Sequence, residues 1–425
     1  MAESTRVREH LATAAHAALV AAPVGVVVGA AIAAYDWVVN SLLWGSFTAA
    51  LPDWALALLP IAGMALTGAL LRLFKVRSPS MADEVVRAYH EPDHGIDYGT
   101  ALPKLAASVA TMGFGASAGM EGASKWLGAT ISSFLQRQIN RAPGLRAAKG
   151  KIETTLLVGA AAGIAAIFRA PLTGAIMGIE SPYKHDLAHD ALLQGLVASA
   201  LSFATFSILR TSEPYFPIHW SYVLDLRDLA LCVPLGLLAG LASHLFLWLL
   251  FGLKRVWAQW TWPVLLKYVA GGLLVSALAY LSLWLLGEPA TLQAGLPVAN
   301  RLLSGQYALA ACLLLFALKL LATAVTFGTG GVGGLFVPSA TIGAALGAAC
   351  DHLFHPSQPG LFTLIGVAAF TGASYNSLLF AAVFVAEATG SASLVVPGLI
   401  ASAVAFLVSA GVSNSPSQRH QRHAA

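Results

Sequence analysis

The chain has 425 residues, of which 57% are hydrophobic and only 10% are charged, and its formal net charge is +4. Soluble globular proteins carry roughly 25% charged residues because their surfaces face water, so this composition excludes a water-soluble body and predicts an integral membrane protein. The small positive excess is expected to orient the chain in a membrane, and no nucleic-acid partner is predicted.

The N-terminal segment lacks the pattern of a signal peptide. Met1–His10 is polar and of mixed charge, and the apolar run that follows has no short core with a small-residue cleavage site. Basic residues cluster at Arg6 and Arg8, Arg72–Arg77, Arg137–Lys151 and Arg419–His423. Because loops rich in lysine and arginine stay on the cytoplasmic side, we expect both termini to be cytoplasmic in a multi-pass protein of the cell (inner) membrane.

Long apolar runs follow in chain order, each near the roughly 20 residues that a helix needs to cross about 30 Å of hydrocarbon. Lipid offers no hydrogen-bond partners to exposed strand edges, so runs of this length are predicted to be helices. They cover about Ala14–Tyr35, Trp54–Leu73, Thr154–Ile179, Leu229–Phe251, Pro263–Leu286, Tyr307–Phe327 and Leu394–Val412. The predicted fold class is therefore all-α and polytopic.

The polar residues between these runs show no metal or cofactor pattern. The charged stretch from Asp83 to Asp97 is interpreted as a solvated connection. Each of the three cysteines stands alone in apolar surroundings, and the histidines lack a spacing such as H-E-x-x-H. No cofactor is predicted, and the absence of a nucleotide-binding motif argues against ATP-driven transport.

Small residues of the first half recur in the second half at a constant spacing of 215 positions, from 113 to 328. The pairs are Gly113 and Gly328, Gly115 and Gly330, Gly119 and Gly334, Ser124 and Ser339, Gly128 and Gly343, and Ala129 and Ala344. Downstream, Gly159–Glu180 resembles Gly366–Glu387 at a spacing of 207, from 180 to 387. We interpret this as an internal duplication with halves of about 14–210 and 229–412, in which Glu180 and Glu387 cap or pack helices.

Each half contains a glycine-rich break inside hydrophobic sequence, at Gly113–Gly122 and at Gly328–Pro338. Paired breaks at corresponding positions indicate a substrate site between the repeats, near the middle of the bilayer. A broken helix presents free backbone N–H groups and the positive end of its dipole, which an anion satisfies well. The alternative is that these glycines only allow close helix packing.

A hydrolase is the competing interpretation from another class. Gly115–Gly119 fits the pattern G-x-S-x-G, which would make Ser117 a nucleophile with His185 or His189 as its base. The context disagrees, because no strand precedes the serine and Val332 stands at its equivalent in the second half. We therefore do not expect an enzyme.

Segments in the same order and spacing resemble motifs of the CLC family of chloride channels and proton–chloride antiporters. Gly119–Ala123 reads Gly-Met-Glu-Gly-Ala, which resembles the family's G-R/K-E-G-P, and Gly334–Pro338 matches its G-x-F-x-P. Phe168–Glu180 is similar to the family's F-N-A-P-L-A-G segment, which ends in glutamate. The resemblance covers roughly Arg72 to Val412.

The resemblance implies a homodimer with one pore per subunit, each subunit being an inverted repeat of tilted and re-entrant helices. Several helix N-termini would converge on dehydrated chloride, with Leu335 and Phe336 amides at the central anion and the hydroxyl of Ser80 on the cytoplasmic side. The anion-binding residues that it implies are Ser80, Gly119, Met120, Gly122, Gly334, Leu335, Phe336 and Val337.

Glu121 is the residue that the resemblance implies as the gate. An ionisable group inside a membrane span is a functional candidate in its own right, since an unpaired charge there is costly. Its carboxylate can take the place of an anion among backbone amides, and protonation would release it. The alternative is a structural ion pair with Lys125, one helical turn later.

Several residues depart from the family pattern. Met120 replaces a basic residue and Ala123 replaces a proline, and the segment from Ser80 to Glu84 keeps only the serine of the family's G-S-G-I-P. Ser181 stands where proton-coupled members often carry a second glutamate. These changes favour conduction over strict proton coupling.

The family's pore tyrosine lies on its last helix, and this chain has none after Val412. Ser415 or Ser417 is expected near its place.

We therefore predict a single transmembrane domain over residues 1–425, without a cytosolic regulatory domain. Its expected function is transport of monovalent anions, most of all chloride, as a channel or a weakly proton-coupled transporter. A fully coupled proton–chloride antiporter is the alternative. The expected partners are chloride or a similar anion, the lipid bilayer and a second copy of the chain.

Overall fold

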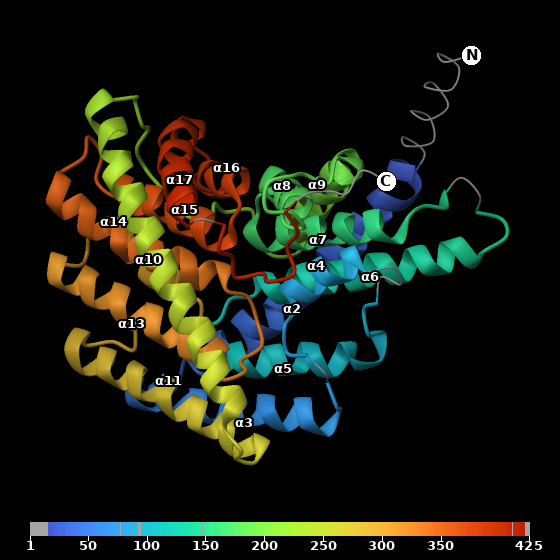
Figure 1. The fold of residues 1–425 in the computed structure, drawn as a ribbon, viewed down its shortest axis with the longest axis horizontal. Coiled ribbons are helices and arrows are strands. Elements are labelled where there is room, and N and C mark those ends of the chain that lie inside the picture. Colours follow the sequence, from blue (N-terminus) through green and yellow to red (C-terminus); the bar gives the residue numbers. More distant parts are fainter. Residues whose placement is uncertain (1–15, 77, 92–94, 146–147, 410, 421–425) are drawn as a thin grey trace.

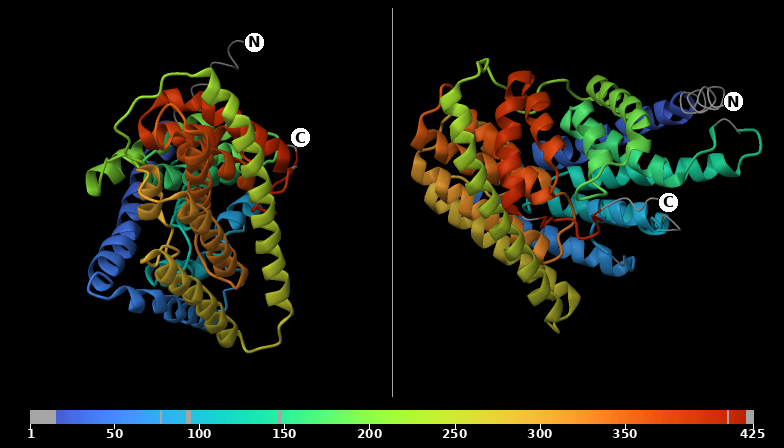
Figure 2. Two further views of the ribbon diagram at one scale, coloured as in Figure 1. Left: turned by 90° about the vertical axis from the view of Figure 1, so that its left-hand side faces the viewer. Right: turned by 45° about the horizontal axis from the view of Figure 1, so that its top comes forward.

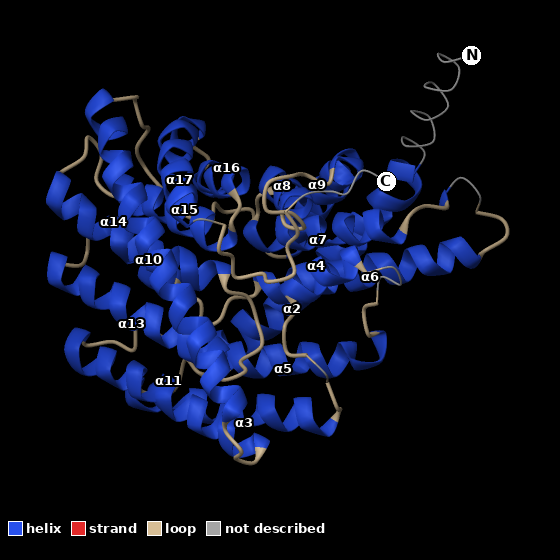
Figure 3. Cartoon of the chain, viewed as in Figure 1, coloured by secondary structure: helices blue, strands red, loops and turns tan. Residues whose placement is uncertain are grey.

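The computed structural model describes residues 16–76, 78–91, 95–145, 148–409 and 411–420. Within these ranges the chain forms helices joined by loops, and its extended pairings are limited to two isolated β-bridges (Figure 3). The predicted all-α fold class is confirmed. Arg6 and Arg8, on which the position of the N-terminus was argued, lie outside the described residues.

The first half contains two π-helical segments and a series of α-helices. In chain order they are η1 (Ala17–Ala21), α2 (Ala22–Asp36), η2 (Trp37–Phe47), α3 (Asp53–Leu73), α4 (Ala82–His90), α5 (Ala101–Gly113), α6 (Glu121–Arg141), α7 (Ile152–Phe168), α8 (Pro171–Glu180) and α9 (Leu192–Leu209). Short 3-10 turns precede α5 and α9. In Figure 1 this half, coloured blue to green, lies mostly to the right.

The second half lies mostly to the left in Figure 1, coloured yellow-green to red. Its helices are α10 (Leu226–Gln259), α11 (Val264–Leu286), α12 (Leu296–Leu303), α13 (Leu309–Gly328), α14 (Phe336–Phe354), α15 (Leu361–Tyr375), α16 (Leu378–Thr389) and α17 (Val395–Ser409). Figure 2 shows α10 running obliquely along much of the molecule.

Among the described residues, seven helices are long and apolar enough to cross a membrane. One of them, His189–Leu209, was not among the predicted runs. Its mean hydropathy, 1.8, is the lowest of the set, because residues such as Gln194 and Ser199 dilute the apolar signal.

The predicted run Thr154–Ile179 is wrong as one helix. Arg169 takes a left-handed conformation with φ of 56° and ends α7, and Pro171 begins α8. A proline fits the first turn of a helix because its missing N–H is not needed there.

The charged stretch that was predicted to be a solvated connection is also wrong in part. Its first residues form α4, and Glu84, Val85 and Val86 on this helix are buried. The sequence of α4 is amphipathic, and its apolar side packs on α6 and α7. A run with many charges therefore contributes a packed helix.

The two halves repeat in structure as the glycine spacing predicted. α5 ends at Gly113 and α13 ends at Gly328, while α6 begins at Glu121 and α14 begins at Phe336. Both intervals are 215 residues, counted from 113 to 328 and from 121 to 336. The helices therefore stop and restart at equivalent places.

The equivalent glycines of the two breaks pair with each other. Gly119 N–H donates to the carbonyl of Gly334 over 2.8 Å, and Gly334 N–H donates back to Gly119 over 2.6 Å. Reciprocal bonds between equivalent residues agree with a local two-fold relation between the halves. The predicted inverted repeat is confirmed at its centre.

A second reciprocal contact joins α8 and α16. Glu180 accepts hydrogen bonds from the N–H groups of Leu379 and Phe380 at the start of α16, over 3.1 and 3.0 Å. Glu387 accepts from Leu172 and Thr173 at the start of α8, over 2.9 and 2.6 Å. Each glutamate thus caps the helix of the other half, which confirms the predicted capping role.

We expect Glu387→Ala to lower the free energy of unfolding by about 2–3 kcal/mol, because it leaves backbone donors of α8 without an acceptor. The midpoint of SDS-induced unfolding in mixed micelles measures this loss. Glu387→Gln keeps one carbonyl acceptor and should lose less, while Glu213→Ala, on an exposed loop, should lose almost nothing. Equal stability of all three variants would contradict the capping role.

Candidate functional site

Two cavities lie on either side of the paired glycine breaks. The first, here called the Glu121 cavity, has a volume of about 380 Å³ and is also lined by Met120 and Val337. The second, the Lys125 cavity, has a volume of about 110 Å³ and is also lined by Gly333 and Leu335. The starts of α6 and α14 therefore stand between the two cavities.

The Glu121 cavity carries both signs of charge. Arg210 at the end of α9 donates to Asp36 of α2 over 2.7 Å, and both line the cavity. Arg169, from the turn between α7 and α8, also lines it and lies 5.0 Å from the ring centre of Tyr215. Besides Glu121 the cavity holds two guanidinium groups and one carboxylate, so a net positive charge that can attract anions is left once Glu121 is neutral.

The carboxylate of Glu121 sits on the first amides of α14. The side chain is only 2% exposed. Its Oε1 atom accepts hydrogen bonds from the N–H of Phe336 and, over 3.3 Å, from the N–H of Val337. Its Oε2 atom is buried without a hydrogen-bond partner among the described residues. A negative oxygen therefore occupies the free N–H groups of a helix N-terminus, which is a binding place for anions.

Glycines make room for this carboxylate. A Cβ atom at Gly119 would overlap the carboxylate of Glu121, and one at Gly334 would overlap both the carboxylate and the backbone N of Gly122. A Cβ at Gly122 would meet the backbone of Gly333. The glycine-rich breaks thus bring two helix starts and one carboxylate closer together than residues with side chains allow.

The predicted anion-binding residues divide between the two cavities. Met120 and Val337 line the Glu121 cavity, whereas Leu335 and Ser80 line the Lys125 cavity. The main chains of Gly119, Gly122 and Gly334 form the seam between them. Anion binding at these positions stays a prediction.

The side chain of Phe336 points away from its own amide into an aromatic cluster. Its ring centre lies 4.8 Å from that of Phe168, 4.8 Å from Phe384, 5.1 Å from Phe380 and 5.6 Å from Tyr375. These rings come from both halves; the phenylalanines are fully buried, and Tyr375 is partly exposed. The cluster therefore fixes the start of α14, whose amides hold Glu121.

Tyr375, at the end of α15, lines the Lys125 cavity and was missed by the sequence reasoning. A tyrosine was sought only after Val412, where the chain has none. Tyr375 is the equivalent of Phe168 at the second repeat spacing of 207, from 168 to 375. An alignment of the two halves residue by residue would therefore have placed this tyrosine at a position equivalent to a motif residue. The cavity thus has a phenol on its wall from another helix.

The serines that were expected near the place of that tyrosine bind Asp83 on α4. Ser415 Oγ donates to Asp83 over 2.6 Å, and Ser417 donates through its N–H over 3.0 Å and its Oγ over 2.8 Å. Ser415 also lines the Lys125 cavity, as does Ser181. The segment after α17 therefore covers one side of this cavity.

The alternative ion pair between Glu121 and Lys125 is not formed. Across the described residues, no salt bridge joins these two side chains, and they line opposite cavities. Glu121 and Lys125 are one helical turn apart on α6, but the carboxylate of Glu121 accepts hydrogen bonds from the first N–H groups of α14 instead.

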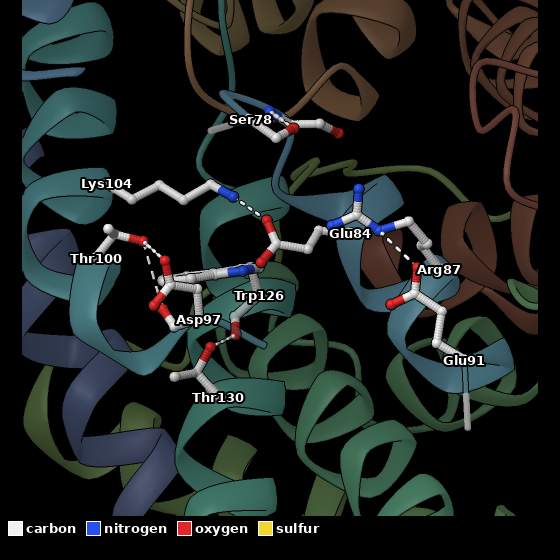
Figure 4. A network of polar contacts seen from close by, with 10 residues as sticks. Ser78, Glu84, Arg87, Glu91, Asp97, Thr100, Lys104, Trp126 and Thr130 are labelled. Carbon is white, nitrogen blue, oxygen red and sulfur yellow. Dashed lines mark hydrogen bonds and ion pairs between the residues drawn. The ribbon is translucent and has the colours of Figure 1, made fainter. Parts of the chain in front are cut away.

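A buried ion pair joins α4 to α5 (Figure 4). Lys104 of α5 donates to Glu84 of α4, and both side chains are almost fully buried. The ammonium group also lies 5.1 Å from the ring centre of Trp126 on α6. Because a charge left alone inside a protein is strongly destabilising, this pair holds α4, and with it Asp83, in a defined place.

Ser117 does not have the surroundings of a nucleophile. Its hydroxyl is hydrogen-bonded to that of Thr323 over 2.9 Å, and its N–H donates to Thr326 over 3.1 Å. His185 packs instead on Phe406, with ring centres 5.8 Å apart. The structure therefore engages Ser117 and His185 with other partners.

Known proteins were compared with this chain. A family model described as voltage gated chloride channel matches residues 62–410. The voltage-gated ClC-type chloride channel ClcB of Citrobacter koseri is 27% identical over 416 residues, covering 92% of this chain and 95% of the relative. The H(+)/Cl(-) exchange transporter ClcA of Cronobacter sakazakii is 28% identical over 384 residues, covering 85% of this chain and 78% of the relative.

Two solved structures share the fold. A CLC-type fluoride/proton antiporter has a TM-score of 0.81 and 24% identity, covering 94% of this chain and 97% of the other. A slow cyanobacterial Cl-/H+ antiporter has a TM-score of 0.80 and 23% identity, covering 93% and 94%.

Proposed function

The chain belongs to the voltage-gated chloride channel (CLC) family, a family of anion channels and transporters, and from this we propose that it passes chloride through its two cavities with Glu121 as the gate. The observation that carries the proposal is the position of the Glu121 carboxylate. It occupies the amides of Phe336 and Val337, between the cavities, where a permeating anion would be held.

The gate works by competition between two negative groups. While Glu121 is ionised, its carboxylate takes the free N–H groups at the start of α14 and keeps chloride out. Protonation removes its charge, so that the side chain leaves the amides and an anion takes its place. Chloride flux should therefore rise as the pH falls. Asp36, Arg169 and Arg210 line the same cavity and set the local field.

Strict coupling of chloride to protons is the less favoured alternative. Ser181 stands where coupled members often carry a second glutamate, and it lines the Lys125 cavity without supplying a carboxylate. The similar relatives include both a channel and an exchanger by name. We propose passive or weakly coupled transport.

The Lys125 cavity is assigned to the cytoplasmic side. The segment after α17 lines it and continues into the basic tail, where Arg419 N–H donates to the carbonyl of Pro182. Basic segments remain in the cytoplasm. On this rule we propose that the protein lies in the cell (inner) membrane with its C-terminus and its N-terminus in the cytoplasm. The family resemblance supports a homodimer, each subunit with its own pathway.

The proposal is tested by reconstituting the purified chain in liposomes and following chloride efflux and proton uptake together. We expect chloride efflux with a proton movement that is small and not in a fixed ratio to it. A fixed ratio would establish the antiporter instead. Equal transport of glutamate, sugars or cations would contradict anion transport altogether.

A further inference from the structure

Lys125 is a buried cation that the gate mechanism does not use. It lies on α6, one turn after Glu121, its side chain is 3% exposed, and it lines the Lys125 cavity. In the part of the chain that the structure describes, its ammonium group makes no hydrogen bond, ion pair or cation–π contact. The residue is buried, its ammonium group borders the cavity, and the field of Asp83 favours its charge without a hydrogen bond. A charge held in this way gains from a ligand of opposite sign in the cavity.

The charges around it do not balance. The other ionisable groups with formal charge on this cavity are Asp83 of α4 and Lys254 of α10. The oxygens of Asp83 already accept hydrogen bonds from Ser415 and Ser417. One carboxylate, which also binds these serines, faces two ammonium groups, so the cavity has one positive charge in excess.

The neutral groups on the cavity wall also favour an anion. Leu335 is the N-cap residue of α14, so the start of this 19-residue helix also borders the cavity, while its first amides hold Glu121. Tyr375 and Ser80 line the same space, and both carry hydroxyl groups that can donate. The helix end and the lone ammonium are independent features that converge on one place.

We propose that Lys125 is a direct ligand for a monovalent anion in the Lys125 cavity, on the cytoplasmic side of Glu121. This inference rests on the proposed function, because the anion bound there is the one that passes the gate. Lys125 supplies a full positive charge to a site whose serine motif is degenerate. The bound chloride in turn compensates the charge of the ammonium group.

The competing explanation is a structural pairing of Lys125 with Asp83. The two explanations predict different effects of Asp83→Asn on chloride binding. If chloride is the partner of Lys125, removing the carboxylate removes a competitor, and binding becomes tighter. If Lys125 serves only as the partner of Asp83 and does not contact chloride, Asp83→Asn leaves the chloride affinity unchanged.

The experiment is isothermal titration of chloride into the purified full-length protein, prepared in a chloride-free buffer. Lys125→Met should weaken chloride binding by roughly tenfold or more, since it removes a charge-assisted hydrogen bond. Lys125→Arg should keep the affinity within roughly threefold, because the charge remains. Lys151→Met, at an exposed lysine, is the matched control. Unchanged affinity in Lys125→Met would overturn the assignment.

A structural readout covers the case in which Lys125→Met does not fold. Crystals of the unchanged protein grown in bromide should show an anomalous peak within roughly 3.5 Å of Lys125 Nζ. A bromide peak in this cavity away from Lys125 would contradict the proposal. A protein that binds chloride through Lys125 but passes none in liposomes would contradict the proposed function and leave the ligand assignment standing.

Discussion

Replacing Glu121 by glutamine is expected to make chloride flux independent of pH and to abolish proton movement. The amide keeps an oxygen that the N–H groups of Phe336 and Val337 can reach, but it carries no charge and binds no proton. Removing a charge-assisted competitor worth about 1.5–3 kcal/mol should raise flux at neutral pH by roughly ten- to hundredfold. The measurement is chloride efflux from liposomes between roughly pH 4 and pH 8, a range that includes the pH values at which carboxyl groups and histidines titrate.

Two further variants make this result specific to the gate. Glu213→Gln removes a carboxylate from an exposed loop and should leave the pH profile unchanged. Asp36→Asn removes the other carboxylate of the Glu121 cavity and breaks its ion pair with Arg210, so it should change the flux but keep its rise at low pH. If chloride efflux by Glu121→Gln still depends on pH, Glu121 is not the gate.

Gly119→Ala should remove the pH dependence by a steric route, with Glu121 unchanged. The three atoms nearest to a Cβ atom at Gly119 all belong to the Glu121 carboxylate, the movable end of a side chain, whereas at Gly334 a Cβ atom would also meet backbone. The methyl group therefore expels the carboxylate and leaves the seam between the helices intact. We expect a pH response reduced by roughly tenfold, comparable with the loss of the same charge-assisted hydrogen bonds.

The double variant Gly119→Ala with Glu121→Gln tests whether both changes act through one contact. Its pH profile should match that of Glu121→Gln alone, because effects of residues in contact do not add. Gly252→Ala is the control, since a Cβ atom there meets nothing within 4 Å. A Gly119→Ala protein with the normal pH profile would show that the carboxylate does not work from this position.

Local patterns were sufficient for most of the helices and failed at specific places. Apolar runs near 20 residues long were found because a membrane span needs that length. The helix Leu192–Leu209 was missed because its polar residues face inward onto other helices, as Ser199 and Ser202 do. The break at Arg169 was missed because one left-handed residue hardly changes the hydropathy of a run.

The charged stretch shows the opposite failure. Asp83–His90 was taken for a loop because its charges were expected to face water. In the structure, Glu84 is paired with Lys104 inside the protein, and the serines after α17 bind Asp83. A charged side chain can be buried when a residue from a distant segment forms an ion pair or hydrogen bonds with it. A local sequence pattern does not identify that distant residue.

By itself, the sequence determined that this protein lies in a membrane, that it is built from two equivalent halves, and that Glu121 stands at a helix start inside a glycine-rich break. Composition, repeat spacing and motif order are properties of the chain alone. Only the tertiary structure decided that the carboxylate rests on Phe336 and Val337, and that Lys125 and Tyr375 share a cavity. The physical reason is that these contacts join segments roughly 200 residues apart, and their geometry depends on how the two halves pack.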